Sequence, residues 1–250
     1  MKMVVKEWLV RTERLEIVFD GEALDDMRAL ELIFAGLDAI GARRAMFGSH
    51  GRELGRADLE AQVMASRRFP TDLRAENYEF RFGGSVAWKH TFVMVTGSPG
   101  DVGVWESWVS RAMGMPGFVQ SWISQRDYDY WQNAEDPLEY PGSGRSCEHL
   151  PMISSGDPPP LDRVIIDTSR NPGRRTIRSG YVEGIGAVMW LSPLFWQRVR
   201  RQRNDAELVE AGWHVTALSD GNIKVDAAMN VFTEQGDSAE QARLRAAIYG

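Results

Sequence analysis

Apolar residues recur in two different periods along the first forty residues. The segment "RLEIVFD" (14–20) has three consecutive apolar residues at its centre and predicts a buried strand. Between 24 and 40 the apolar residues return at steps of three and four, which predicts a helix with one apolar face. Acidic residues occupy its first turns, where the helix dipole favours them, and Gly41 stands at the expected C-cap. The apolar face of this predicted helix comprises Leu24, Met27, Leu30, Phe34, Leu37 and Ile40.

The pattern changes several times in the middle of the chain. Residues 56–68 predict a second helix. Residues 77–98 are rich in β-forming side chains and predict two antiparallel strands, with a turn or bulge at Gly83-Gly84. We expect a further strand over 101–109 and a helix over 116–125.

A long irregular connection separates the two halves of the chain. Residues 141–160 contain five prolines and three glycines, which interrupt regular structure. Beyond them we expect strands over 162–169 and 180–193, a helix over 194–202, a hairpin turning at Asp220-Gly221 and a C-terminal helix. The residues expected to begin these two helices are Ser192, Pro193 and Ser238.

Strands followed by helices and joined by hairpins predict an α+β fold. Its sheet is expected to be mostly antiparallel and flanked by several helices. Neither half has a complete alternating pattern alone, so we expect one domain over 1–250, with 141–160 as an irregular segment within it.

The net charge says more about possible binding partners than the overall composition does. Hydrophobic residues make up 43% and charged residues 26% of the chain, as in an ordinary globular protein. The net charge of -6 offers no basic field for nucleic acid or an anionic membrane, but it allows a basic protein partner. The N-terminal residues lack the long apolar region of a signal peptide, and no run approaches the about 18 apolar residues of a membrane helix. A cytoplasmic location is therefore expected.

Few residues point to catalysis. The four histidines have no metal-binding spacing and the glycine patterns of nucleotide sites are missing, so no catalytic residue, metal or cofactor is expected. Cys147 stands two residues before His149, which leaves open an enzyme with a cysteine nucleophile. Two arginine-rich runs, 171–178 and 198–203, could contact phosphates, but a solvated surface is favoured in an acidic protein.

One stretch, "DYDYWQNAEDPLEY" (127–140), combines five acids and four aromatic residues without Lys or Arg. Tyr and Trp are enriched at protein interfaces, and acids steer a basic partner. A solvated loop is an alternative, and so is a chemical site, because Asp127 and Asp129 would share one face of a strand. The candidate partner-binding residues are Asp127, Tyr128, Asp129, Tyr130, Trp131, Glu135, Asp136 and Glu139.

The order of elements and the placement of aromatic residues resemble a known family. The segments "GARRAMFG", "YEFRFGGSVAWKHTFVMV", "IGAVMWLSPLFWQ" and "GWHVTALSDGNIKVDAAMNVF" together resemble the Immunity protein 52 family of bacterial polymorphic toxin systems. The resemblance covers most of the chain and implies a non-catalytic cytoplasmic protein. Such a protein neutralises a cognate toxin, often a nuclease-like effector of a type VI secretion system. A nuclease presents a basic surface to DNA, which an acidic inhibitor could cover.

Two other functions stay open beside the immunity protein. One is an uncharacterised hydrolase-like enzyme that uses the loop around Cys147 and His149. The other is an adaptor or structural domain. A toxin gene next to this one would favour the immunity protein. A deep pocket with strongly shifted pKa values would favour the enzyme. A large exposed apolar patch without a toxin partner would favour the adaptor.

Overall fold

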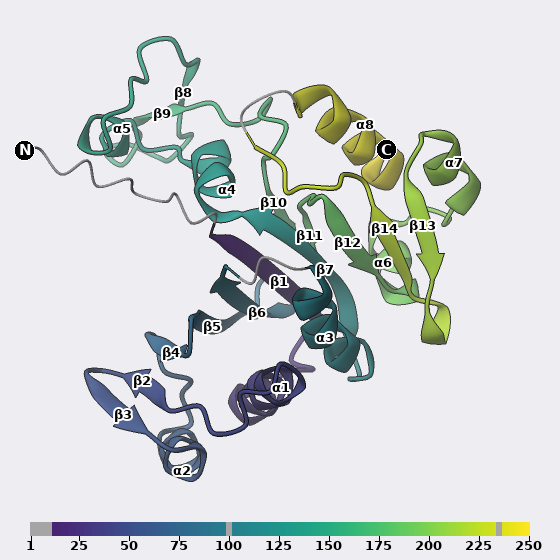
Figure 1. The fold of residues 1–250 in the computed structure, drawn as a ribbon. Coiled ribbons are helices and arrows are strands. Elements are labelled where there is room, and N and C mark those ends of the chain that lie inside the picture. The colour runs from purple at the N-terminus through teal and green to yellow at the C-terminus, as the bar shows by residue number, and fades with distance from the viewer. Residues whose placement is uncertain (1–11, 99–101, 234–236) are drawn as a thin grey trace, which may run out of the picture.

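A ten-stranded antiparallel sheet forms the centre of the computed structural model, which describes residues 12–98, 102–233 and 237–250 (Figure 1). The sheet confirms the predicted α+β fold. Strands from both sides of residues 141–160 belong to it. In order across the sheet they are β13 (His214–Ala217), β14 (Ile223–Asp226), β12 (Val188–Leu191), β7 (Phe118–Gln125), β1 (Glu13–Asp20), β6 (His90–Gly97), β5 (Tyr78–Ser85), β4 (Leu73–Ala75), β2 (Phe47–Ser49) and β3 (Arg52–Leu54).

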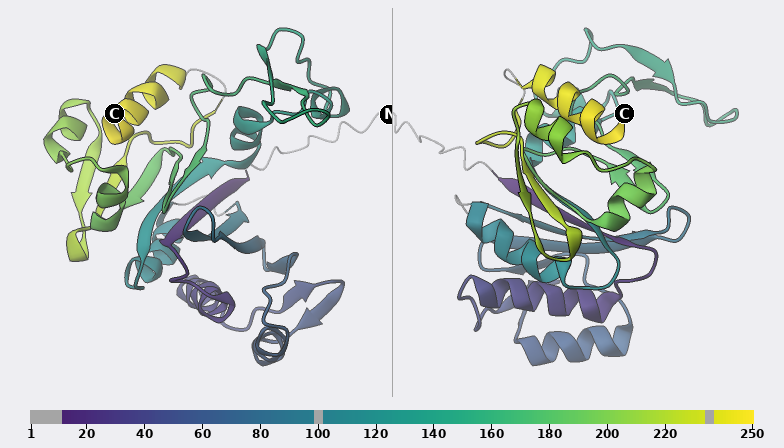
Figure 2. Two further views of the ribbon diagram at one scale, coloured as in Figure 1. Left: turned by 180° about the vertical axis from the view of Figure 1, so that it is seen from behind. Right: turned by 90° about the vertical axis from the view of Figure 1, so that its right-hand side faces the viewer.

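Helices pack on both faces of this sheet (Figure 2). We call these the α1 face and the α8 face, after one helix on each. The α1 face has α1 (Asp26–Ala39), α2 (Arg56–Ser66) and α3 (Val102–Met113), and the α8 face has α6 (Pro193–Val199), α7 (Asp205–Glu210) and α8 (Ser238–Tyr249).

Strand β1 shows why the sequence of a central strand contains consecutive apolar residues instead of an alternating pattern. Leu15, Ile17 and Phe19 pack in the core of the α1 face, whereas Val18 packs in the core of the α8 face. A strand covered on both faces needs apolar residues at consecutive positions. Glu16 is the exception, because it is a buried acid on the α8 face of the same strand.

The strand predicted over 101–109 is wrong, because the described residues of this segment belong to helix α3; residue 101 lies outside the described ranges. Trp105, Trp108, Val109 and Ala112 are buried at steps of three, one and three. Their spacing places them on one side of a helix against the α1 face. The aromatic and β-branched composition concealed this helical period.

The helix predicted over 116–125 is also wrong, because Phe118–Gln125 form strand β7. Gly117 takes a φ of +83° directly after Pro116 and turns the chain into the strand. β7 lies between β1 and β12, and seven of its eight residues are buried, so it shows no alternation that could have identified it.

The predicted hairpin of residues 77–98 is present, but its turn lies elsewhere. Gly83 and Gly84 are inside β5, and the turn occupies Val86–Lys89. A Cβ at Gly83 would lie 2.8 Å from Cζ of Phe92 on β6. This glycine therefore makes room for a neighbouring aromatic ring across the sheet.

The helix ends follow the predicted chemistry with one correction. Asp25 caps α1, and Gly41 follows its end with a φ of +84°. Ser192 accepts a hydrogen bond from the backbone N–H of Phe195, as expected of an N-cap before Pro193. The last helix is preceded by Asp237, so Ser238 is its first residue and not its cap. The predicted hairpin at Asp220-Gly221 joins β13 to β14.

The second half also contains short elements outside the main sheet. The acidic stretch forms helix α4 (Arg126–Asn133) and the single turn α5 (Glu139–Gly142), so Asp127 and Asp129 lie on a helix and not on a strand. The predicted strand over 162–169 shortens to β9 (Val164–Ile166), which pairs with β8 (Met152–Ser154). The strand predicted over 180–193 divides into β11 (Tyr181–Glu183) and β12, and β11 pairs with β10 (Thr176–Arg178).

Candidate functional site

Two buried acids and two half-buried arginines fix helix α4 to the α8 face of the sheet. Arg14 and Glu16 come from β1, Asp129 from α4, and Arg175 from the loop before β10. Nη1 of Arg14 lies 2.8 Å from Oδ2 of Asp129, and Nη1 of Arg175 lies 3.6 Å from the same oxygen. Nη2 of Arg175 donates to Oε1 of Glu16. We call these four residues the charge quartet.

Burial governs the electrostatics of the charge quartet. The side chain of Glu16 is 3% exposed, and this burial raises the pKa of its carboxyl, while the nearby Arg175 guanidinium opposes the rise. The Arg175 guanidinium also lies 5.5 Å from the ring centre of Trp122. The two cations and two anions of the charge quartet have no net charge. Their ion pairs connect three segments that are distant in sequence: β1, α4 and the loop before β10.

The side of α4 that faces the protein interior makes further hydrogen bonds to neighbouring elements. The Gln125 side chain accepts a hydrogen bond from the Tyr128 backbone N–H at the start of the helix. The Tyr128 hydroxyl is hydrogen-bonded to the buried Gln241 of α8. The Asn133 side chain accepts from the backbone N–H of Arg175 at 2.7 Å. With one side fixed in this way, α4 presents its other side outward.

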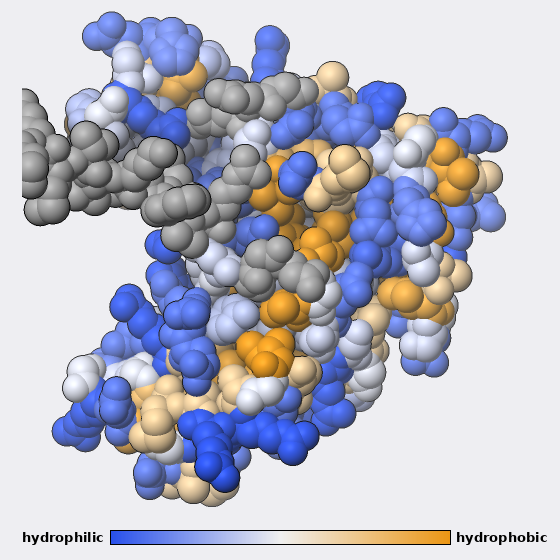
Figure 3. All heavy atoms as spheres, viewed as in Figure 1, coloured by the Kyte–Doolittle hydropathy of each residue, from blue (hydrophilic) through white to orange (hydrophobic). Residues whose placement is uncertain are grey.

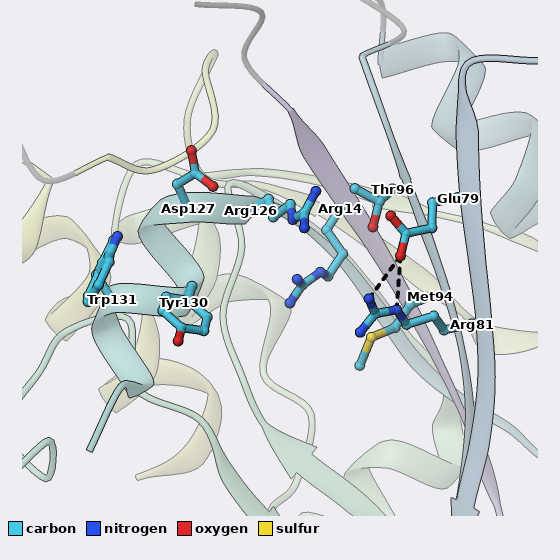
Figure 4. A pocket seen from close by; sticks show the side chains of 9 residues that line it. All are labelled: Arg14, Glu79, Arg81, Met94, Thr96, Arg126, Asp127, Tyr130 and Trp131. Atoms are coloured by element: carbon cyan, nitrogen blue, oxygen red, sulfur yellow. Dashed lines mark hydrogen bonds and ion pairs between the residues drawn. The ribbon is translucent and has the colours of Figure 1, made fainter. Parts of the chain in front are cut away.

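A groove of about 430 Å³ lies between the outer side of α4 and strand β5 (Figure 4). A space-filling view shows the molecule hollowed on this side, with mostly hydrophilic residues along the lower edge of the hollow (Figure 3). Charges of both signs and two aromatic rings face the groove. We call it the α4–β5 groove, and its lining residues are Arg14, Glu79, Arg81, Met94, Thr96, Arg126, Asp127, Tyr130 and Trp131.

The aromatic rings of the groove are positioned by neighbouring contacts. The rings of Trp131 and Tyr140 meet edge to face with centres 4.8 Å apart, and the Arg145 guanidinium lies 4.5 Å from the Trp131 ring centre. The Tyr130 hydroxyl donates to Oε2 of Glu139 at 2.5 Å. An aromatic ring that is already positioned loses little conformational entropy when a partner binds.

The eight candidate partner-binding residues fall into two groups. Tyr128 and Asp129 are buried and connect α4 to the rest of the fold. Trp131 and Asp136 are half-buried. The outward-facing residues are Asp127, Tyr130, Glu135 and Glu139.

Residues 135–167 project from the main body as an arm (Figure 1). Its β8–β9 hairpin is separate from the main sheet. The arm has seven acidic residues and two arginines, so it carries a charge of -5 out of the -6 of the whole chain with His149 neutral. We call it the acidic arm. Its exposed large apolar residues are Leu138, Met152, Ile153, Leu161 and Val164.

Cys147 and His149 lie in this arm without a mutual hydrogen bond. The Cys147 thiol is half-buried and lies 3.7 Å from the backbone oxygen of Pro137. The His149 side chain is exposed. Among the described residues, no polar contact joins the two side chains.

Sequence reasoning missed three of the four residues of the charge quartet. Arg175 lies in the run 171–178, for which we predict a solvated surface. Its side chain is half-buried and forms an ion pair with Glu16, so that prediction is wrong at this position. The available signal was the polar pair Arg14 and Glu16, two residues apart in an otherwise apolar strand. In the run 198–203, Arg198, Arg201 and Arg203 pair with acids instead of standing free in solvent.

Two further structural features are missing from the described ranges. No three His, Cys, Asp or Glu side chains there are grouped to hold a metal ion. No helix in those ranges has the length and apolar character needed to cross a membrane.

The fold is similar to that of a solved protein. Over 94% of this chain and 72% of the other, the structure matches a Pseudomonas aeruginosa T6SS protein, PA0821, with a TM-score of 0.50 and 9% sequence identity. No protein-family model and no curated protein matches the chain. Membership of the Immunity protein 52 family therefore stays a prediction, and the likeness at this identity concerns the fold alone.

Proposed function

We propose that this chain is an immunity protein that binds and neutralises a toxin of a type VI secretion system without catalysis of its own. The toxin is expected to act in the cytoplasm, and the immunity protein to meet it there. The observation that carries the proposal is the concentration of negative charge and exposed apolar residues on the acidic arm. The likeness in fold to a T6SS protein supports the same biological setting.

The acidic arm fits a partner with a basic surface. Acidic side chains attract such a partner before contact is made, and the exposed apolar residues then supply contact area in the complex. Leu138 and Ile153 are 82% and 46% exposed, so this contact area is accessible. A nuclease-like toxin has a basic surface because it must hold the phosphates of nucleic acid.

Helix α4 continues the binding surface towards the body of the protein. Asp127 and Tyr130 line the α4–β5 groove, and Glu135 and Glu139 follow at the base of the acidic arm. The groove offers aromatic anchors that are partly positioned before binding. Its mixed charges fit a partner segment that carries both signs.

The test is binding to the product of a neighbouring toxin-like gene, measured by calorimetry at several salt concentrations. The triple variant Asp127→Lys, Glu135→Lys, Glu139→Lys should weaken the wild-type affinity by about tenfold or more and reduce its salt dependence. The same variant should lose protection against the toxin in a growth assay.

A second triple variant controls for net charge. Glu31, Glu53 and Glu210 are exposed acids outside α4 and the acidic arm. Changing all three to Lys alters the net charge equally, yet should leave the affinity within about twofold. Equal weakening by both triple variants would assign binding to overall charge, and no effect of the first would remove this surface from the interface.

A further inference from the structure

A second cavity, of about 570 Å³, lies between helix α8, the β10–β11 hairpin and the loop at 170–174. Its volume is in the range of small-molecule sites. Four arginines line it together with one acid, Glu183. We call it the arginine pocket, and its arginines are Arg170, Arg174, Arg178 and Arg245.

Arg245 is the most unusual residue of the arginine pocket, because it is a buried cation without an acidic partner among the described residues. It is 8% exposed, and its guanidinium donates to the backbone oxygens of Glu183 at 3.2 Å, Pro172 at 3.4 Å and Arg174. Its Nε has no hydrogen-bond partner there. Burial lowers the pKa of Arg245. Backbone oxygens carry only partial charge and the nearby Glu183 carboxylate adds a further attraction, so the positive charge is cancelled only in part.

The other arginines leave the pocket strongly basic. Nε of Arg178 lies 2.7 Å from Oε1 of Glu183, so the one acidic side chain of the lining is already paired with one of the four arginines. Arg174 donates to the backbone oxygen of Asn171 at 3.2 Å, and neither Arg170 nor Arg174 forms an ion pair within the described ranges. The side chains of the lining therefore sum to a charge of about +3 in a protein with a net charge of -6.

We propose that the arginine pocket binds a small multivalent anion that carries phosphate or carboxylate groups. Guanidinium groups donate paired hydrogen bonds that match the geometry of both groups. A small ligand experiences the local field of the pocket, because charges beyond about 8 Å are screened at physiological salt. A long polyanion would also extend over the acidic surface of the protein, so an extended nucleic acid is disfavoured.

The experiment is a calorimetric titration of the full chain with inorganic pyrophosphate at about 50 mM and 150 mM salt. Wild-type protein should bind with a dissociation constant at or below about 1 mM at the lower salt. Citrate, titrated in parallel, distinguishes the two chemistries: tighter binding of pyrophosphate assigns a phosphate ligand, and tighter binding of citrate a carboxylate ligand.

Paired variants locate the binding. Arg170→Ala with Arg174→Ala should weaken pyrophosphate binding by about tenfold or more, because two of the four cations of the pocket are lost. Arg43→Ala with Arg44→Ala is the matched control, since these adjacent arginines are exposed and lie outside the pocket. The control should retain the wild-type affinity. Unfolding curves check that both double variants fold.

Three results would overturn the proposal. The first is no heat of binding for wild-type protein with either anion at about 10 mM. The second is equal weakening in the two double variants, which would indicate non-specific attraction to arginine. The third is unchanged affinity in the Arg170/Arg174 double variant, which would place the anion elsewhere.

Discussion

At the scale of single residues, the pair of Glu16 and Arg175 joins positions 159 residues apart in the sequence. The Arg175 guanidinium opposes the rise that burial causes in the pKa of Glu16, and it also lies over the Trp122 ring. Removing one partner of a buried pair is costly because the other charge stays buried. The pair is therefore expected to respond to mutation more than any ion pair at the surface.

Arg175→Met removes the cation, including its contact with the Trp122 ring, and retains an unbranched apolar side chain at this position. It should lower the free energy of unfolding by about 3 kcal/mol at pH 8. Without Arg175 the pKa of Glu16 rises further above its unfolded value. A group with a raised pKa contributes stability at low pH and loses it as the pH rises through that pKa. The variant should therefore be less destabilised at pH 5 than at pH 8, measured by urea unfolding at both pH values.

Two companion variants test this explanation. Adding Glu16→Gln to Arg175→Met removes the stranded carboxylate, so the double variant should regain stability at pH 8 and lose the added pH dependence. Arg178→Met breaks the more exposed pair with Glu183 and should cost less than about 1 kcal/mol. Equal losses for the two single Arg→Met variants would contradict a special role of the buried pair.

At the scale of elements, sequence patterns identified the helices with one solvated face and the strand β1, but missed the buried strand β7 and the helix α3. Helix α1 shows its period because its other face is solvated, and Ser192 with Pro193 marks the start of α6. Strand β7 is buried almost throughout and carries no alternation. Helix α3 was missed because its tryptophans favour strands by composition, although their spacing is helical. The position of α4 depends on Arg175, which lies in a loop and has no local signal.

The contact between α1 and α3 depends on a glycine. A Cβ at Gly36 would lie 2.0 Å from Cε3 of the fully buried Trp108. Gly36→Ala gains about 1 kcal/mol of helix propensity, but overpacking against a ring this close costs about 3 kcal/mol, so the variant should lose about 2 kcal/mol of stability. Gly142→Ala is the control, because a Cβ there meets no atom within 4 Å. Denaturant midpoints that shift equally in both variants would exclude close packing as the cause.

At the scale of the whole molecule, charge and stability are distributed unevenly. The acidic arm has a net charge of -5, which leaves about -1 for the remaining residues. The acidic stretch was visible in the sequence, but its grouping with the β8–β9 hairpin depends on contacts made by folding. The buried residues of the cluster under the arm are Ala134, Tyr140 and Ile166, whereas the two cores of the sheet are far larger.

This imbalance predicts that the acidic arm opens before the sheet does. A segment with few buried apolar residues unfolds locally at a lower free energy than the central strands. In hydrogen exchange followed by mass spectrometry, the amides of Ser155 and Ile166, which donate to Arg163 and Glu135, should exchange about 100-fold faster than those of β7. A bound partner that covers the arm should slow their exchange and leave the amides of β7 unchanged. Exchange of the arm and β7 at one common rate would mean that both open only with the whole molecule, and the acidic arm would then be a rigid part of the fold.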